Sequence, residues 1–221
     1  MADITDNNVA RAARLDTATL SDALDRLGIV GQCYRISPRD PGFALAGRAF
    51  TMLCGPASTP PGTVGDFIDD VPAGHVVVID NGGRDDATIW GDILTEIAHR
   101  RGLGGTVIDG INRDIALCRE LGYPVFSRGN WMRTGKDRVQ VEKMQCPVNI
   151  GGARVSPGDI LRGDADGVVV LPAEHEAAVL DAAEEIQAAE ENIRAACRGG
   201  MRLDEARKAF KYHSLQSRPK A

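Results

Sequence analysis

The sequence predicts an α/β fold with a parallel βαβ core, an antiparallel or barrel-like layer and a long C-terminal helix. Three observations favour this class. Apolar runs alternate with helical patterns between residues 75 and 129, the order that produces parallel strands joined by helices. Short β-like runs separated by Gly, Pro and Asp fill residues 141–172. An amphipathic pattern then covers residues 173–197.

The composition of the 221 residues is that of an ordinary globular protein, with 43% hydrophobic and 26% charged residues. The formal net charge is −5 and no basic stripe is present, which argues against a nucleic-acid surface. The longest aliphatic runs, VVVI and VVVL, are far shorter than the ~20 residues of a membrane span, and the first residues lack the apolar stretch of a signal peptide. We therefore expect a cytoplasmic protein without nucleic-acid or membrane partners.

The cysteines and histidines do not suggest a disulfide framework or a zinc site. The five cysteines are widely spaced and never form a CxxC arrangement, so most are expected to be small buried residues. The four histidines show no paired metal spacing. A zinc site built from histidines is therefore not expected.

The first predicted elements are a helix and a strand. Residues 16–28 have a helical pattern, with a capping-box-like start at Thr19 and Asp22 and a stop at Gly28. Residues 44–54 have the composition of a strand, and the cluster of Pro and Gly after them predicts a turn. The pattern then changes to that of the parallel core.

Five consecutive segments predict this core. The continuous apolar run at 75–80 indicates a strand buried on both faces, and a helical pattern follows at 91–102. A second buried strand at 106–110 leads through INRD to a short helix at 116–122. Residues 124–129 complete the β-α-β-α-β order as a third strand.

Candidate catalytic residues follow the first two of these strands. Ligands of open α/β sheets bind outside the carboxyl ends of the strands. Asp92 stands at the start of the first helix of this unit, and Arg113 and Asp114 follow the second strand. Because sequential strands of a βαβ unit are usually neighbours, we expect these three side chains to meet at one edge of the sheet.

The same edge offers backbone donors for an anion. If Gly91 opens the helix, the amides of Ile93 and Leu94 lie in its first turn without intrahelical partners and can receive a substrate carboxylate. A hard cation such as Mg²⁺ prefers oxygen ligands and keeps several waters. Asp114 with Asp92 would therefore suffice to hold it beside a chelating substrate.

Spacing alone leaves a structural interpretation open for each candidate. Asp92 can simply complement the dipole of its helix, worth ~0.3–1 kcal/mol, and Arg113 with Asp114 can be a turn with a surface ion pair. The Asp85–Asp86 pair is typical of turn chemistry. Trp90 is expected in a core or an interface.

The long C-terminal helix has one residue that breaks its apolar pattern. Glu190 interrupts the predicted buried seam, and a charge there is costly unless it is paired or placed at a site. The alternative is that Glu190 lies at the edge of the stripe. The predicted seam consists of Val179, Ala183, Ile186, Glu190, Ile193 and Cys197.

The tail from Arg202 is charged, and its end, SLQSRPKA, is expected to fray.

These residues resemble the signature of the 4-hydroxy-4-methyl-2-oxoglutarate / 4-carboxy-4-hydroxy-2-oxoadipate aldolases, relatives of regulator of ribonuclease activity A. The signature is an Asp, twenty intervening residues and then Arg-Asp, which here is Asp92 followed by Arg113-Asp114. TATLSDALDRLG and PGDILRGDADGVVVLP are also similar, so the resemblance covers about residues 16–200. It implies a single domain over 1–221 with a swivelling β/β/α (RraA-like) architecture and a charged tail at 202–221.

The resemblance also implies roles for the candidate residues. Asp114 would bind Mg²⁺ or Mn²⁺ directly, Asp92 would hold metal-bound water, and Arg113 would contact the carboxylate and keto oxygen of the substrate. The amides of Ile93 and Leu94 would bind the pyruvyl carboxylate. A homotrimer or hexamer is implied, with active sites between subunits, where Glu190 of a neighbouring subunit would support the metal waters.

The implied activity is that of a class II aldolase. It would cleave 4-hydroxy-2-oxo acids to pyruvate through an enolate and would also decarboxylate oxaloacetate. The alternative is a non-catalytic regulator of ribonuclease activity that acts by protein binding, but such regulators typically lack the Asp that this chain retains at Asp114. The group beyond C4 of the substrate is left open: Arg35, Arg84 and Arg133 are candidates for a distal carboxylate, and each is also typical of a surface residue.

Overall fold

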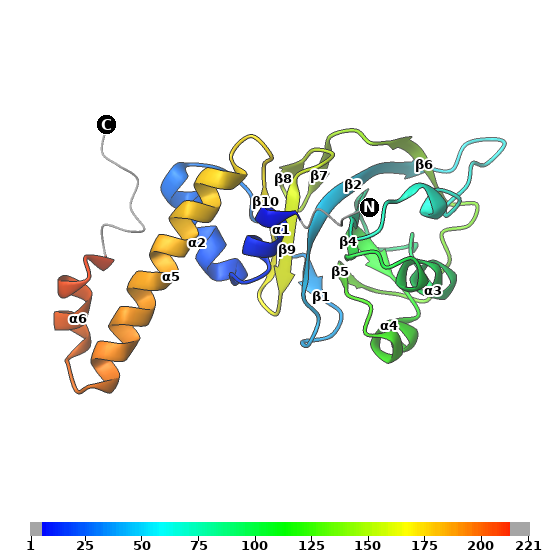
Figure 1. Ribbon diagram of the computed structural model, residues 1–221. Coiled ribbons are helices and arrows are strands. Elements are labelled where there is room, and N and C mark those ends of the chain that lie inside the picture. Colours follow the sequence, from blue (N-terminus) through cyan, green and yellow to red (C-terminus); the bar gives the residue numbers. More distant parts are fainter. Residues whose placement is uncertain (1–5, 213–221) are drawn as a thin grey trace, which may run out of the picture.

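The computed structural model describes residues 6–212 and is built on an eight-stranded mixed sheet (Figure 1). Four neighbouring strands of this sheet are parallel, and the strands at its two ends pair antiparallel. The predicted α/β class, with a parallel core and an antiparallel layer, is therefore confirmed. In sheet order the strands are β1 (Ser37–Pro38), β5 (Val125–Asn130), β4 (Gly105–Asn112), β3 (Val76–Arg84), β2 (Leu45–Pro56), β9 (Ile160–Asp164) and β10 (Gly167–Leu171), and β6 (Val139–Met144) pairs with β2 beside this path.

The parallel strands form the main core. Every residue of β4 is buried, as are the four apolar residues that begin β3, because helices and a hairpin cover the strands. The helices α3 (Asp92–Arg100) and α4 (Ile115–Leu121) connect β3 to β4 and β4 to β5. The hairpin of β7 (Val148–Ile150) and β8 (Ala153–Val155) packs against β2, β3 and β4.

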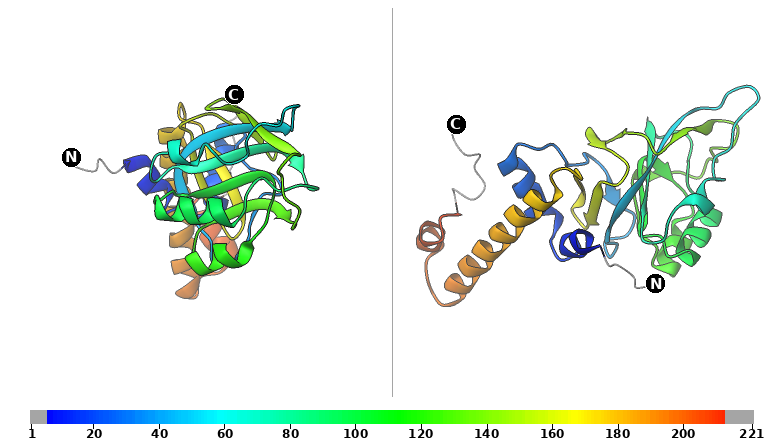
Figure 2. Two further views of the ribbon diagram at one scale, coloured as in Figure 1. Left: turned by 90° about the vertical axis from the view of Figure 1, so that its right-hand side faces the viewer. Right: turned by 45° about the horizontal axis from the view of Figure 1, so that its top comes forward.

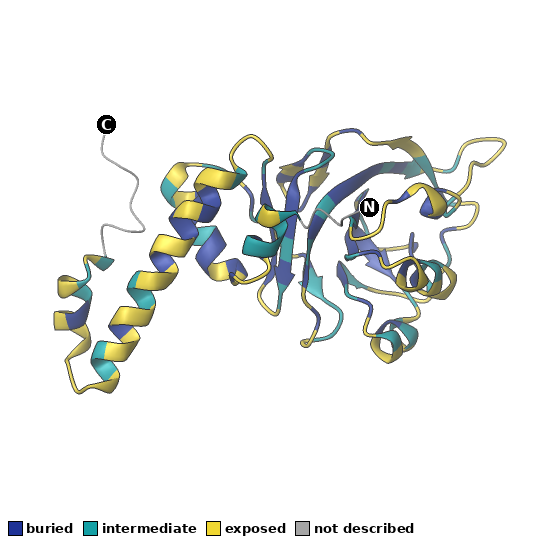
Figure 3. Cartoon of the chain, in the orientation of Figure 1, coloured by how far each residue is buried: buried dark blue, intermediate teal, exposed yellow. Residues whose placement is uncertain are grey.

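A second core joins the two terminal regions of the chain. The helices α1 (Asn7–Ala12), α2 (Thr17–Leu27) and α5 (Glu176–Arg198) pack with β9 and β10, and their buried side chains form one apolar cluster. The predicted long helix is therefore confirmed. Its distal half extends away from the sheet and is largely exposed (Figures 1 and 3). All five cysteines are free thiols, and all except Cys197 are buried.

Two details of the predicted helix at 16–28 differ in their outcome. Its stop at Gly28 is confirmed, because that residue is the left-handed C-cap at φ 72°. Its start at Thr19 and Asp22 is wrong. Asp16 is the N-cap, because its extended backbone lets the carboxylate accept the Thr19 N–H at 2.7 Å.

The strand predicted at 75–80 continues further than its apolar run. β3 includes the segment NGGR, which lies beyond the predicted end of the strand at residue 80. Its pairing with β4 shifts between Asp80 and Arg84, and Gly82 and Gly83 adopt φ values of 63° and 71°. The extension is therefore an irregular bulge that glycine permits, and an apolar pattern does not predict it.

The charged region after Arg202 contains a helix that the sequence pattern missed. α6 (Leu203–Ala209) packs against α5 and buries Ala206 completely. It has acidic residues in its first turn and basic residues in its last, which favour the helix dipole. Charge alone was thus a poor indicator of a tail. The end predicted to fray lies outside the described residues.

Among the described helices, none combines the length and the apolar character needed to cross a membrane.

A short 3-10 turn, η1 (Ile68–Asp70), lies between β2 and β3 and packs against α3. This turn forms one wall of a cavity beside α3.

Arg48 of β2 connects the two cores to the N-terminus of α5. Its guanidinium binds Glu176, which is largely buried, and donates to Asp6 at 2.7 Å. Hydrogen bonds from Arg48 lower the pKa of both carboxyl groups below their ordinary values. Their stabilising contribution is therefore fully present above the unfolded-state pKa values of about 4 and is lost as the pH falls through the lowered folded values.

We expect Arg48→Met to reduce the free energy of unfolding at pH 7 by about 2 kcal/mol, because Glu176 loses charge-assisted hydrogen bonds. The difference from the parent chain should shrink below about pH 4 as the carboxylates protonate. Urea unfolding at several pH values measures this. Arg154→Met is the matched control, because Arg154 is exposed. A loss of stability in Arg48→Met that stays the same at low pH would contradict the stabilising role of these ion pairs.

Candidate active site

The loops after β3 and β4 meet at the carboxyl edge of the parallel strands. The Arg113 N–H donates to the carbonyl oxygen of Trp90 at 3.0 Å, and the Asp92 N–H donates to Oδ2 of Asp114 at 3.0 Å. Nε of Arg113 lies 3.2 Å from the same carboxylate oxygen. The structure therefore brings Asp92, Arg113 and Asp114 together, as the βαβ pattern predicts.

Asp114 has an unusual backbone that aims its carboxylate at α3. It is the N-cap of α4 and adopts the left-handed conformation, with φ 60° and ψ 40°. Few residues other than glycine adopt this region, and Asp is among the more tolerant because its short polar side chain can bond locally. The contact with the Asp92 N–H fits this description.

Gly91 supplies the space for this contact. It is the N-cap of α3, as predicted, and its φ of −150° is accessible to any residue. A Cβ atom at this position would lie 2.8 Å from Oδ2 of Asp114 and 3.0 Å from Nε of Arg113. Glycine is therefore required here for close approach and not for backbone conformation.

Trp90 anchors the site to the core, which confirms its predicted burial. Its ring stacks on Tyr123 with centroids 6.2 Å apart, and its indole N–H donates to the Thr95 hydroxyl at 2.9 Å. That hydroxyl in turn donates to the carbonyl oxygen of Gly91 at 2.9 Å. Because every partner in this chain is buried or backbone, the first turn of α3 is held in place.

The two amides proposed to bind an anion differ in their availability. The Ile93 N–H donates to Oδ1 of Asp92 at 2.8 Å, so a substrate carboxylate would have to replace that contact. The Leu94 N–H has no hydrogen-bond partner within residues 6–212 and is one of the free donors of a helix N-terminus.

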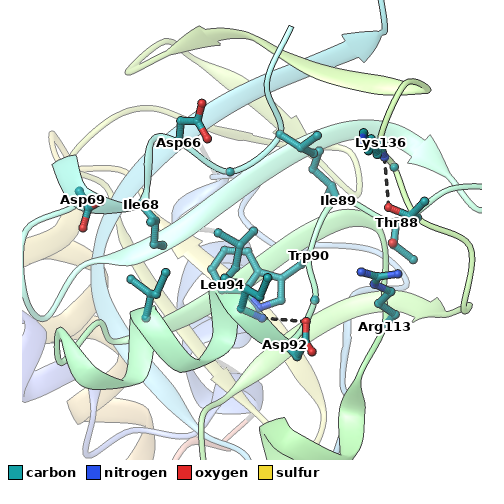
Figure 4. A pocket seen from close by; sticks show the side chains of 17 residues that line it. Asp66, Ile68, Asp69, Thr88, Ile89, Trp90, Asp92, Leu94, Arg113 and Lys136 are labelled. Atoms are coloured by element: carbon teal, nitrogen blue, oxygen red, sulfur yellow. Dashed lines mark hydrogen bonds between the residues drawn. The ribbon is translucent and has the colours of Figure 1, made fainter. Parts of the chain in front are cut away.

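A cavity of about 390 Å³ opens beside these groups (Figure 4). This volume lies within the range of small-molecule sites, about 300–1,000 Å³. Asp92, Arg113 and the amide-bearing residues Ile93 and Leu94 line it, together with Lys136, a cation that the sequence analysis missed.

Lys136 reaches the cavity because its loop packs closely on the segment before Trp90. Thr134 forms an isolated parallel β-bridge with Thr88. A Cβ atom at Gly135 would lie 2.1 Å from the carbonyl oxygen of Thr88. Glycine at 135 thus lets the loop approach. No periodic pattern in the sequence links these two distant segments, so only the fold identifies Lys136.

The donor set of the site suits a hard cation better than zinc. Within residues 6–212, no group of three or more His, Cys, Asp and Glu side chains lies together in a metal-binding arrangement. The acids beside Arg113 at this edge are Asp92 and Asp114. Mg²⁺ and Mn²⁺ accept such a set because they keep several waters, whereas zinc sites use three or four protein ligands.

Glu190 does not join this site within one chain. It lies on the distal half of α5, at the opposite end of the molecule from α3 (Figures 1 and 2). Its side chain is 24% exposed and pairs with Arg194 at 3.3 Å. The flanking seam residues Ile186 and Ile193 are buried, so Glu190 lies at the edge of the apolar stripe.

The three arginines considered for a distal carboxylate all lie outside the cavity lining. Arg84 and Arg133 both face Asp86, at 2.5 Å and 3.8 Å, and the hydrogen bond from Arg84 lowers the pKa of that carboxyl. Arg35 lies over the ring of Tyr34, 5.8 Å from its centroid. The Asp85–Asp86 pair is part of an exposed bend, which matches the predicted turn.

A mixed α/β domain with two acids and an arginine at the ends of neighbouring parallel strands has the organisation of a strand-end ligand site. The family follows from comparison. The chain belongs to the RraA-like family, whose model, described as Aldolase/RraA, matches residues 17–170.

Two relatives illustrate the range of the family. Protein DlpA of Legionella pneumophila is 37% identical over 96% of this chain, but the chain spans only 35% of that protein. A protein of Halalkalibacterium halodurans named "Putative 4-hydroxy-4-methyl-2-oxoglutarate aldolase" is 34% identical, with coverage of 80% of this chain and 82% of the relative.

Solved structures share the fold. An uncharacterized protein of Pseudomonas syringae pv. tomato has a TM-score of 0.86 and 41% identity, covering 92% of this chain and 98% of that one. RraAS2 of Streptomyces coelicolor, described as an unusual member of the RNase ES inhibitor RraA protein family, has a TM-score of 0.79 and 28% identity over 86% of this chain and 96% of that one. Proteins similar to this chain thus include one named as a putative aldolase and one described as a member of a ribonuclease inhibitor family.

We expect Gly91→Ala to disrupt the site without unfolding the chain. The added Cβ clashes with the Asp114 carboxylate and Arg113, while the backbone conformation is accessible to alanine. Displacements of about 1 Å at a reacting centre can cost about 100-fold in rate. Thermal unfolding and steady-state kinetics measure the two effects separately.

The control is Gly129→Ala in β5, where a Cβ atom meets only Ile111, at 3.8 Å. Its activity should remain within about twofold of the parent. A Gly91→Ala protein with full activity would show that close approach at residue 91 is not needed.

Proposed function

We propose that this protein is a divalent-metal-dependent class II aldolase that cleaves 4-hydroxy-2-oxo acids to pyruvate. The observation that carries the proposal is the cluster of Asp92, Arg113 and Asp114 around the N-terminus of α3, beside a cavity of small-molecule size. Relatives named as aldolases of this type support it.

The chain offers complementary groups for the pyruvyl end of such a substrate. The Leu94 N–H, which no acceptor of the described chain occupies, and the positive end of the α3 dipole attract the C1 carboxylate. Arg113 lines the same cavity and is placed to contact the carboxylate and the C2 oxygen. The buried Trp90 beneath them excludes water on one side.

Cleavage breaks the C3–C4 bond. The C4 hydroxyl loses its proton to a water oriented by Asp92, the C4 oxygen becomes a carbonyl oxygen, and the bond's electron pair passes through C3 to the C2 oxygen as an enolate. Arg113 stabilises the negative charge that develops on that oxygen. Protonation of C3 then gives pyruvate. Loss of CO₂ from oxaloacetate would leave the same enolate, so decarboxylation is part of the proposal.

A divalent cation, Mg²⁺ or Mn²⁺, held by Asp114 and through water by Asp92, would supply Lewis-acid chemistry at the keto oxygen. Two carboxylates match the oxygen ligands that such an ion prefers, and water and substrate would fill its remaining positions. Asp114 would have to shift part of its contact with Arg113, since that pair lies 3.2 Å apart here.

We further propose a homotrimer or hexamer whose sites lie between subunits. Glu190 stands on an arm, the distal half of α5, that extends beyond its own sheet (Figure 1). An arm of this kind can reach a neighbouring copy, where Glu190 would support the water near Asp92.

The second candidate is a non-catalytic regulator of ribonuclease activity that binds a protein partner. Its support is the likeness to RraAS2 of Streptomyces coelicolor. Pyruvate release from several 2-oxo acids, abolished by EDTA and restored by Mg²⁺ or Mn²⁺, separates the two. A regulator would release none under any of these conditions.

We expect Arg113→Ala to lower kcat for pyruvate release by about 100- to 1,000-fold, because the enolate oxygen loses its cationic partner. Arg119→Ala is the matched control, since this exposed arginine of α4 pairs with Asp40 away from the cavity. Unchanged turnover in Arg113→Ala would eliminate the role assigned to this guanidinium.

The intersubunit site predicts complementation between inactive variants. Glu190→Ala and Asp114→Asn should each abolish most activity alone, because every site lacks one group. After subunit exchange in a 1:1 mixture, about a quarter of the sites would combine an intact Asp114 with an intact neighbouring Glu190. Activity that does not recover in a mixture shown to exchange subunits would place Glu190 outside the site.

A further inference from the structure

We propose that the substrate's substituent on C4, where it extends along α3, is an apolar chain and not a second carboxylate-bearing arm. The inference rests on the proposed aldolase function and concerns the part of the cavity beyond the pyruvyl unit. The walls of that part have their own charge pattern, and residues outside the aldolase signature form them.

The cavity is longer than the catalytic cluster and changes character along its length. Figure 4 shows Arg113 and Lys136 at one end and Asp66 and Asp69 at the other. Apolar side chains occupy the intervening walls. These are Val64, Ile68, Ile89, Leu94 and Ile97, with the face of Trp90 between them.

Close packing fixes the far wall of this trough. Gly65 lies over α3, where a Cβ atom would come 3.1 Å from the Leu94 side chain. Arg101 at the end of α3 donates to the carbonyl oxygen of Asp69 at 2.7 Å. The segment 64–70 is therefore attached to α3 at two points, and the trough between them is part of the folded structure.

The direction of the substrate follows from its anchored end. Arg113 and the Leu94 amide hold the C1 carboxylate and the C2 oxygen at the cationic end, so a chain that leaves C4 away from these groups runs toward Ile68 and Asp66. An apolar chain loses contact with water there, which is favourable.

A terminal carboxylate on that chain would be disfavoured for two reasons. It would leave water for an apolar wall without a cationic partner, and it would approach the negative charges of Asp66 and Asp69. Arg101 offsets Asp69 in part, at 3.4 Å, whereas Asp66 has no ion pair within residues 6–212. Lys136 lies at the opposite end, so a carboxylate attached directly to C4 remains compatible with the site.

The test compares two substrates of equal chain length in the full-length protein with Mg²⁺. They are 4-hydroxy-2-oxooctanoate and its analogue with a carboxylate at C8. We expect kcat/KM for the alkyl substrate to be at least about tenfold higher, within the range that hydrophobic pockets achieve. Equal values, or a preference for the diacid, would overturn the inference.

A charge reversal identifies the residue that sets this preference. Asp66→Lys should shift the ratio of the two kcat/KM values about tenfold toward the diacid, because it places a cation at the far end. Asp70→Lys is the matched control, since Asp70 is exposed in the same segment 64–70 but does not line the cavity. An equal response to both variants would show that Asp66 does not contact the chain.

Exchange of the pyruvate methyl protons with deuterium oxide, followed by NMR, reports enolate formation without any distal group. Exchange together with indifference to chain charge would refute the inference and leave the aldolase function intact. The absence of exchange with Mg²⁺ and with Mn²⁺ would refute both.

Discussion

Two hydrogen bonds between neighbouring loops hold the candidate site together. The Arg113 N–H donates to Trp90, and the Asp92 N–H donates to the Asp114 carboxylate. They can form because β3 and β4 pair in parallel with Asp80 opposite Asp109. The segments that follow the two strands therefore leave the sheet at the same level. Trp90 anchors this junction in the core, where its indole N–H donates to the buried Thr95 hydroxyl. The arginine, the acids and the free end of α3 all take their positions from this junction.

The same sheet edge uses aspartate in two different ways. Asp109 is almost fully buried, and its two oxygens accept from Gly151 and Arg128. Asp80 likewise accepts the N–H groups of Gly82 and Asn149. In each of these carboxylates both oxygens accept a hydrogen bond, and one of the donors belongs to the β7–β8 hairpin. Asp114 instead keeps one oxygen without a donor among the described residues, which leaves it able to bind a ligand.

The sequence predicts those parts of the site that depend on local order along the chain. Alternating apolar and helical segments place Asp92 and Asp114 in the connections that follow two neighbouring strands, and the parallel pairing of β3 and β4 makes them meet. Lys136 escaped prediction because its position depends on contact between distant loops that has no periodic signal. The start of α2 was misplaced because Asp16 offered a better cap, and α6 was missed because its burial depends on α5. Packing between remote segments is what a single sequence conceals.

Asp114 shows why fold likeness does not decide between an aldolase and a regulator in this family. Its left-handed backbone suits Gly, Asn or Asp, and either Asn or Asp can accept the Asp92 N–H that joins the loops. Only Asp adds a negative charge to that position. The fold and the junction of the loops can therefore persist without the charge that a cation requires. On this reasoning, the chemistry of the proposed aldolase depends on one carboxylate whose backbone conformation the fold demands for separate reasons.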